Sequence, residues 1–406
     1  MTVYDAHTAT IALQGATLNA DSARVTVDES WSPFVQVNVE CGLPDDLESM
    51  VAVDPRDADR VTLTLRRDYG EVWANSVFTA AHPTPTTNAT LTAAYGGLTN
   101  GAITSLFFRS WNAFGVRDSD TRVFDVTVRR RTIDHLSKKV TLELASDEAL
   151  LQDYALIATT KYVNVQTSLR GLVAYVLGLV GATLQPGSDD ASITAGALEW
   201  APGQSAWDFL RTPVETAALR LWCDEARHWW LTARAPLSAG SLTLTTGENG
   251  TLKSAVDSID RDGDWHDAVV ITYQWTDALG AQQRAYDVAG DALTATKVYS
   301  VTRDQKYPGA GAAAQMLKQS AGRGRVLDLT AVADYRAAPG QAFTAQLPDT
   351  PIQTGVVSAV TWQLPSAEMT VRTRGLTDTP TTAWIFDPPG LSWSSIPVGI
   401  DWTEDI

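Results

Sequence analysis

The chain of 406 residues has few of the residues that build metal sites and disulfide frameworks. Its two cysteines, Cys41 and Cys223, lie far apart in the sequence, so no disulfide framework is indicated. None of its five histidines has a second histidine or a cysteine at metal-ligand spacing, so no zinc site is predicted. We expect both cysteines to be small buried apolar residues.

Basic residues are also scarce. The chain has 31 Lys and Arg against 47 Asp and Glu, which gives a net charge of −16. Because neutralising phosphates requires clustered Lys and Arg, this balance argues against a nucleic-acid-binding surface. The longest basic run, Arg129–Arg131, lies between two strand-like segments, and we interpret it as a solvated face.

Long hydrophobic runs are missing. The most apolar stretch, Leu169 to Leu184, is interrupted by Arg170 and three glycines and is too short to span a bilayer. The N-terminus has neither a basic start nor an apolar core, so it does not resemble a signal peptide. We therefore expect synthesis in the cytoplasm without insertion into a membrane.

Catalytic motifs are equally sparse. No Gly-x-Ser-x-Gly elbow is present, although a triad with members distant in sequence remains open. The glycines at 309–315 precede a helix but lack the Lys-Ser/Thr of a phosphate loop, so they indicate flexibility at the start of that helix. The sequence thus predicts a protein that is not an enzyme and has no cofactor.

One acidic loop could hold a hard cation. Carboxylates from a short loop are the ligands that calcium prefers, and the candidates here are Asp257, Asp260, Asp262, Asp264 and Asp267. The central three, Asp260, Asp262 and Asp264, are the strongest. The loop departs from an EF-hand at Gly263 and Ile271, and the alternative is a solvated turn that leads into a strand.

Residues 147–240 have the densest pattern of local signals and predict a small α/β domain. Ser146 could cap a helix with Leu150, Leu151, Tyr154 and Ile157 on one face, and a half-buried strand precedes it. A second, buried helix should follow Ser168 and end at Gly181.

A third helix should open with a capping box formed by Ser205 and Asp208, and Pro213 should kink it or end it early. A hairpin from Leu219–Cys223 to Trp229–Leu231 should close the domain. The expected core consists of Leu150, Leu172, Val176, Leu177, Val180, Trp207, Leu210 and Leu221.

The flanking regions predict strands, so the expected fold class is α+β and mostly β. Residues 1–69 and 116–146 should form a first β-barrel, with residues 70–115 as an insertion or loop excursion. Residues 241–376 should form a second β-barrel with one helix at Gly311–Ala321. Two to four domains fit this length, and a hydrophobic content of 44% is ample for their cores.

Fourteen tryptophans stand out in the composition. Trp207, Trp222 and Trp229 occupy positions that favour a core or an interface over sugar stacking. Residues 377–406 differ, because prolines break regular structure there while aromatic side chains have little nearby to bury them. We predict an irregular C-terminal arm that docks on a partner through Trp384, Phe386, Trp393 and Trp402.

Three segments together resemble the tail-tip (baseplate) hub proteins of tailed bacteriophages. The middle domain of that family is resembled by the segment "GQSAWDFLRTPVETAALRLWCDEARHWWL". Residues 256–273 resemble the acidic turn and long strand of the family, and residues 339–362 resemble its closing barrel strands. The resemblance covers roughly half of the chain, and its weight comes from the order of the segments.

The resemblance implies two tail-tube-like β-barrel or sandwich units that flank the small α/β domain. It implies a homotrimer at the virion tail tip that presents six barrel copies to a hexameric tube, with an acidic channel through which DNA passes without specific binding. The implied partners are a distal tail or tube protein, the tape measure and further tip proteins. It also implies assembly in the host bacterial cytoplasm.

Two functions from different classes stay open. The first is a structural hub that joins the tail tube to the distal tip. The second is a carbohydrate-binding or carbohydrate-active tail protein that uses the Trp-rich insertion, residues 70–115, to contact the host surface. The hub explains the order of the units, whereas no acid pair in the sequence is singled out for a hydrolase.

Overall fold

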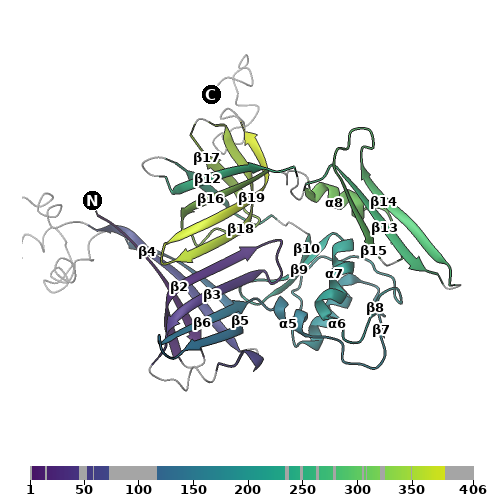
Figure 1. Ribbon diagram of the computed structural model, residues 1–406, viewed down its shortest axis with the longest axis horizontal. Helices are drawn as coiled ribbons and strands as arrows, with labels where there is room; N and C mark the ends of the chain where they lie inside the picture. The colour runs from purple at the N-terminus through teal and green to yellow at the C-terminus, as the bar shows by residue number, and fades with distance from the viewer. Residues whose placement is uncertain are drawn as a thin grey trace, which may run out of the picture.

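In the computed structural model, the chain is mostly antiparallel β-structure with four short α-helices in the described part (Figure 1). The expected fold class, α+β and mostly β, is confirmed. The described residues are 2–13, 16–44, 53–57, 59–72, 117–233, 237–246, 250–261, 265–277, 280–303, 306–307, 309–320, 325–348 and 350–379.

The first six strands pair in a closed ring, which we call the first strand ring. Its pairing order is β1, β4, β5, β6, β3, β2 and back to β1, and every pair is antiparallel. Alternating apolar residues of each strand point inward, as in β3, because side chains on a strand alternate between two faces. The strands are Thr2–Leu13 (β1), Ala16–Asp28 (β2), Val35–Gly42 (β3), Arg60–Val72 (β4), Arg117–Asp134 (β5) and Lys139–Ala145 (β6).

A second strand group lies beside the first ring and continues its sheet. Its pairing order is β11, β17, β18, β19, β16, β12, and β11 pairs with β17 in parallel. The interiors of both groups merge into one hydrophobic cluster that contains residues from Ala9 to Leu376. The strands are Ser241–Thr245 (β11), Leu252–Ile259 (β12), Arg325–Val332 (β16), Ala342–Gln346 (β17), Ile352–Leu364 (β18) and Glu368–Thr379 (β19).

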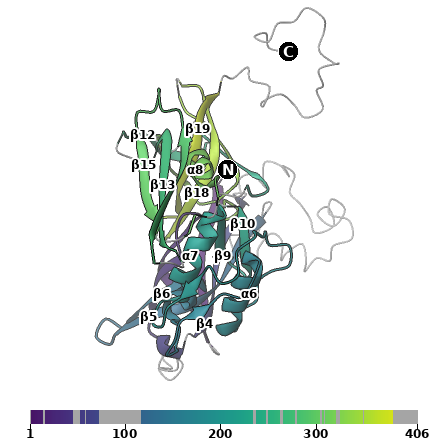
Figure 2. The same cartoon turned by 90° about the vertical axis from the view of Figure 1, so that its right-hand side faces the viewer.

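The middle unit lies to one side of the first ring and has its own core (Figures 1 and 2). The predicted α6 is present with Ser168 as its cap, since the Ser168 hydroxyl accepts from the Gly171 amide, and Gly181 after it has a φ of 72°. The elements are Glu148–Asp153 (α5), Tyr162–Val163 (β7), Leu169–Leu179 (α6), Glu199–Trp200 (β8), Ala206–Thr216 (α7), Leu219–Cys223 (β9) and Trp229–Ala233 (β10).

The capping box and the hairpin are also confirmed. The Ser205 hydroxyl accepts from the Asp208 amide, and β9 pairs with β10. Pro213 does not end α7, which continues to Thr216. The missing amide of Pro213 costs only one bond near the end of a short helix.

The core prediction for the middle unit holds for the second and third helices and fails around α5. Leu172, Val176, Leu177, Leu210 and Leu221 are buried, while Val180 and Trp207 are half-buried against the same cluster. Leu150 is only half-buried, and Ile157 is 92% exposed because α5 ends at Asp153. Ser146 does not cap α5, since its hydroxyl accepts from the Val35 amide instead.

Residues 268–320 contain a third, smaller unit in place of further barrel strands. Here β13 (Ala268–Thr276) pairs with β14 (Gln282–Gly290) and β15 (Val298–Arg303), and α8 (Ala312–Ser320) packs on this sheet. The sequence assigned residues 241–376, which include this unit and its helix, to the second barrel. That assignment needs correcting, because the core of the small unit, which includes Ile271 and Tyr273, is separate from the core of the strand groups.

The described helices include none that is long and apolar enough to cross a membrane. Both cysteines are buried and free, as predicted. Trp229 is buried in the core of the middle unit, also as predicted.

Candidate functional site

The feature that sets the shape of this molecule is the junction between the first strand ring and the second strand group. Its backbone component is an antiparallel pairing of β18 with β2, which runs from Ala359 opposite Asp28 to Leu364 opposite Ala23. The hydroxyls of Thr26 and Thr361 lie 3.0 Å apart across this pairing. One sheet therefore passes from one strand group to the other without a break.

Trp362 of β18 fills the space between the two groups. Its side chain is fully buried, and its indole N–H donates to the Asp334 carbonyl at 2.9 Å. Its ring centroid lies 6.0 Å from that of Phe124 in the first ring and 6.4 Å from that of Tyr335 in the second group. A large aromatic side chain thereby contributes apolar contacts to both groups at once.

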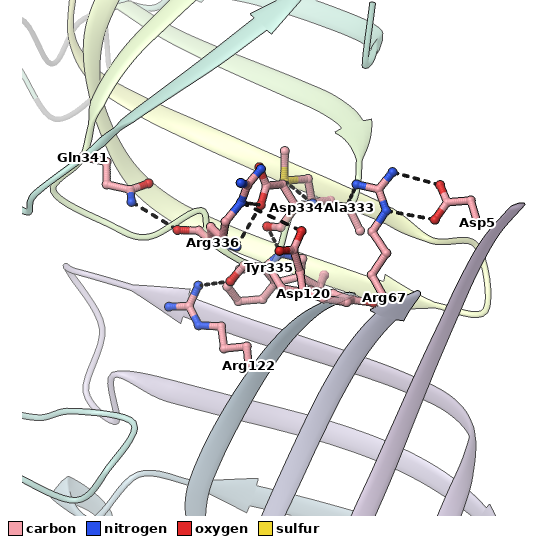
Figure 3. A network of polar contacts seen from close by, with 11 residues as sticks. Asp5, Arg67, Asp120, Arg122, Ala333, Asp334, Tyr335, Arg336 and Gln341 are labelled. Carbon is pink, nitrogen blue, oxygen red and sulfur yellow. Dashed lines mark hydrogen bonds and ion pairs between the residues drawn. The ribbon is translucent and has the colours of Figure 1, made fainter. Parts of the chain in front are cut away.

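Arg122 of β5 connects three units from one position. Its guanidinium donates to the Tyr335 carbonyl at 3.0 Å (Figure 3) and to the Ala337 carbonyl. The guanidinium carbon lies 4.6 Å from the centroid of the Trp362 ring. It also forms an ion pair with Glu225 in the turn of the β9–β10 hairpin. The planar guanidinium suits this task because it can donate in several directions within one plane.

A second set of polar contacts surrounds Arg67 at the same junction. Arg67 donates to Asp5 at 2.9 Å, and Figure 3 shows it lying between Asp5 and the Ala333 carbonyl. On the second group, burial opposes ionisation of Asp334, but hydrogen bonds from Arg336 lower its pKa below the ordinary value. These groups keep charge on both sides of the junction at neutral pH.

The middle unit is held against the first ring by two buried acids. Asp147 pairs with Arg227 at 2.6 Å and accepts from the Thr127 hydroxyl at 2.9 Å. The fully buried Glu148 accepts from the Cys223 amide at 2.9 Å and from the Phe34 amide at 3.2 Å. These contacts tie the hairpin to strands of the first ring.

Burial raises the pKa of Glu148, and hydrogen bonds from Ser146 and the Cys223 amide only partly offset it. The second carboxyl oxygen of Glu148 has no hydrogen-bond partner among the residues that the structure describes. Asp147 and Glu148 lie at the start of α5, where acidic side chains favour the positive end of a helix dipole. The local sequence does not reveal the longer-range role, because the Cys223 and Phe34 amides bound by Glu148 lie 75 and 114 residues away and Arg227, bound by Asp147, lies 80 residues away.

A hollow of about 630 Å³ lies between the β2–β3 turn and α7. Trp31 and Trp207 line it, together with the carboxylates Glu29, Asp208 and Glu215. All three acids have structural partners: Glu29 pairs with Arg374, Asp208 belongs to the capping box of α7, and Glu215 lies 3.8 Å from Arg303.

The acidic loop is only partly within the described residues. Asp260 is exposed and follows β12, whereas Asp262 and Asp264 lie outside the described residues. Asp257 pairs with Arg325 at 2.6 Å. Among the residues that the structure describes, no three His, Cys, Asp or Glu side chains are grouped to hold a metal ion.

Asp267 accepts from the backbone amides of Thr296 and Lys297, which lowers its pKa to about 2. It therefore fixes the start of β15. The predicted docking residues of the arm, Trp384, Phe386, Trp393 and Trp402, and almost all of the 70–115 insertion lie outside the described residues.

Comparison with known proteins finds similarity in fold but not in sequence. No family model matches the chain, and no curated protein matches it. A tail protein from Neisseria meningitidis covers 91% of this chain and 96% of its own, at 10% identity and a TM-score of 0.54. The 43 kDa tail protein of prophage MuSo2 from Shewanella oneidensis covers 90% and 98%, at 10% identity and a TM-score of 0.56. The chain therefore has the fold of phage tail proteins, as its resemblance to tail-tip hubs predicted.

Proposed function

We propose that this protein is a structural hub of a bacteriophage tail tip, which joins the tail tube to the distal tip. The observation that carries the proposal is the fold likeness to two phage tail proteins over nine tenths or more of both chains. The junction supports it, because a hub needs its units held at one angle, and Trp362 and Arg122 hold the two strand groups together. In this role the protein is not catalytic.

The proposed assembly is a homotrimer around an open axis. Two strand groups per chain give six in a trimer, which matches the sixfold symmetry of a tail tube. A net charge of −16 suits a channel through which DNA slides without specific binding, since like charges repel. We propose the distal tail or tube protein, the tape measure and further tip proteins as partners, in a virion assembled in the host cytoplasm.

A phage lacking this gene provides the test. We expect lysates of the null mutant to contain no infectious particles with complete tails, and a plasmid copy to restore them. An epitope-tagged chain should be found at the distal end of restored tails by immunogold electron microscopy. Complete, infectious tails without the chain, or a label elsewhere on the particle, would refute the hub.

The C-terminal arm has its own test within this proposal. The irregular arm was predicted to start at Thr377, but residues 377–379 belong to β19, where Asp378 pairs with Arg325 at 2.8 Å. Deletion of residues 380–406, which keeps β19 complete, should leave the melting temperature of the remaining chain unchanged and reduce its incorporation into tails, because the arm is proposed to gain order only on a neighbour. An unfolded truncation, or one incorporated at normal occupancy into infectious tails, would contradict this role.

A second candidate function is carbohydrate binding in the hollow lined by Trp31 and Trp207. Exposed indole rings stack on sugars, and Trp31 is 45% exposed. The structural partners of Glu29, Asp208 and Glu215 favour the hub. Glycan-array binding that is lost in both Trp31→Ala and Trp207→Ala, with unchanged folding, would favour the sugar site instead.

A further inference from the structure

The two strand groups repeat the same arrangement of five strands. Strands β4, β5, β6, β3 and β2 pair in that order in the first ring, and β17, β18, β19, β16 and β12 pair in the same order in the second group. Chain order matches too, because β5–β6 and β18–β19 are both hairpins. The sixth strand of each group is paired differently, since β1 is antiparallel to β4 whereas β11 is parallel to β17.

Local irregularities recur at matching places, which allows the two groups to be aligned residue by residue. The β5–β6 pairing shifts register between Val128 and Arg130, and the β18–β19 pairing shifts at two places, of which the shift between Val357 and Ala359 matches and the shift between Thr354 and Val356 has no counterpart. Both hairpin turns contain a non-glycine residue at positive φ, 54° in the first and 53° in the second. On this alignment Ile133 matches Trp362.

The strands β2 and β12 align in the same way. The β2–β3 pairing shifts register between Ala20 and Ser22, and the β12–β16 pairing shifts between Leu252 and Ser254. Thr26 therefore matches Ser258, and Asp28 matches Asp260.

Among the strands that the structure describes, only one of the two possible junctions is made within a chain. The end of β18 pairs with β2, so the equivalent end of β5 and the equivalent strand β12 are the two surfaces left over. Among the described strands, β5 pairs with β4 only as far as Thr127, and residues 130–134 pair with β6 alone. In the same part of the chain, β12 pairs with β16 alone.

Strand β12 has the properties of a surface that another chain covers. Seven of its eight residues are exposed, among them Val256 at 57% and Ile259 at 79%. An exposed edge strand with apolar side chains invites pairing with another strand, and folded proteins normally protect such edges.

The two surfaces left over carry side chains of opposite charge and matching hydroxyl groups. The end of β5 begins with Arg129, Arg130 and Arg131, which contact Asp153, Glu143 and the Val53 carbonyl within the chain, whereas β12 contains Asp257, which pairs with Arg325, and is followed by Asp260. When the register of the existing junction is transferred, Arg130 lies opposite Asp260. Thr132 then lies opposite Ser258, which reproduces the facing hydroxyls of Thr361 and Thr26.

We propose that β12 of one copy pairs antiparallel with residues 130–134 of β5 in a second copy of this chain. In this register Ile133 takes the place of Trp362 and lies opposite Asp257. The contact is head-to-tail and repeats the junction within the chain, so successive chains continue one sheet around a ring. The inference rests on the proposed hub and supplies the contact by which its copies join.

Disulfide trapping in the full chain tests the register. Thr132→Cys and Ser258→Cys are combined in one chain, because directly opposed residues of an antiparallel pair bring their β-carbons within disulfide reach. Both native cysteines are buried and should not interfere. We expect oxidation to give covalent dimers and trimers on a non-reducing gel, and a mixture of the two single variants to give a dimer only.

Two further pairs serve as controls. Thr26→Cys with Thr361→Cys should form a disulfide within the chain and report that the fold and the oxidant are sound. Thr132→Cys with Ser254→Cys is out of register by four residues and should link at least tenfold less.

The oligomeric state, measured by native mass spectrometry and in purified tails, distinguishes failure of the strand pairing from failure of the proposed hub. A trimer in which the 132–258 pair links no better than the 132–254 pair overturns the strand pairing and leaves the hub intact. Linked dimers of the Thr132→Cys variant alone would also overturn it, because they indicate a symmetric contact. Absence of the chain from the tail tip overturns the hub itself.

Discussion

Removal of the Trp362 side chain should destabilise both strand groups together. The indole is fully buried, contacts Phe124 and Tyr335, and donates to the Asp334 carbonyl at 2.9 Å. Truncation of a buried tryptophan to alanine costs about 3–5 kcal/mol, because apolar contacts are lost and a cavity remains. Trp362→Phe keeps most of the apolar contact but leaves the Asp334 carbonyl unpaired, which costs about 1–3 kcal/mol.

The measurement is urea denaturation followed by circular dichroism, with Trp31→Ala as the matched control. Trp31 is 45% exposed, so its truncation should change the free energy of unfolding by about 0.5 kcal/mol or less. A chain with several units need not unfold in one step, so the midpoint of the β-sheet signal is compared among variants. If Trp362→Ala and Trp31→Ala lower this midpoint equally, Trp362 does not hold the groups together.

Three further predictions concern buried groups. Glu148→Gln should flatten the dependence of melting temperature on pH. Burial raises the pKa of Glu148 in the folded protein, so the stability that its neutral form contributes is fully present below the unfolded pKa and is lost as pH rises through the folded pKa. Equal slopes between pH 4 and 8 would contradict this. Leu172→Ala should lower the free energy of unfolding, measured by urea denaturation, by roughly 2–5 kcal/mol, whereas Leu179→Ala on the exposed side of the same helix should lower it much less. Similar losses for the two variants would show that the buried face of the helix is assigned wrongly. Cys41 and Cys223 should not react with a thiol reagent at pH 8 until the protein is denatured, since both are buried and burial raises the pKa of Cys41 to about 12. Rapid modification of the native protein would disprove their burial.

Elements of the middle unit could be predicted because their signals are local. Ser168 caps α6 through an amide three residues away, and Ser205 does the same for α7. The residues of the β9–β10 hairpin alternate between buried and half-buried, and the turn joins them directly. Each of these interactions is complete within one short window of sequence, so the window predicts the element.

Strands β12 and β14 were missed for the opposite reason. Most side chains of "LKSAVDSI" and "QQRAYDVAG" are exposed, so neither sequence has the regular alternation of buried and polar residues that identifies a half-buried strand. Each is a strand because a neighbour supplies hydrogen bonds to its backbone, β16 for one and β13 for the other. Pairing of this kind depends on residues far away in the chain.

The sequence by itself determined the β, α/β, β order of the chain, the caps of α6 and α7, the burial of both cysteines and the likeness to tail-tip hubs. The order of the units, the caps and the burial of the cysteines follow from periodicity, capping chemistry and composition, which act over a few residues, whereas the likeness rests on the order of three segments that resemble that family. Only the tertiary structure decided that β18 joins β2, that Trp362 and Arg122 connect the units, and that residues 268–320 leave the second strand group. The partners in the junction are separated by 28 to 335 residues, and no local pattern specifies which distant strand or carbonyl a side chain will meet.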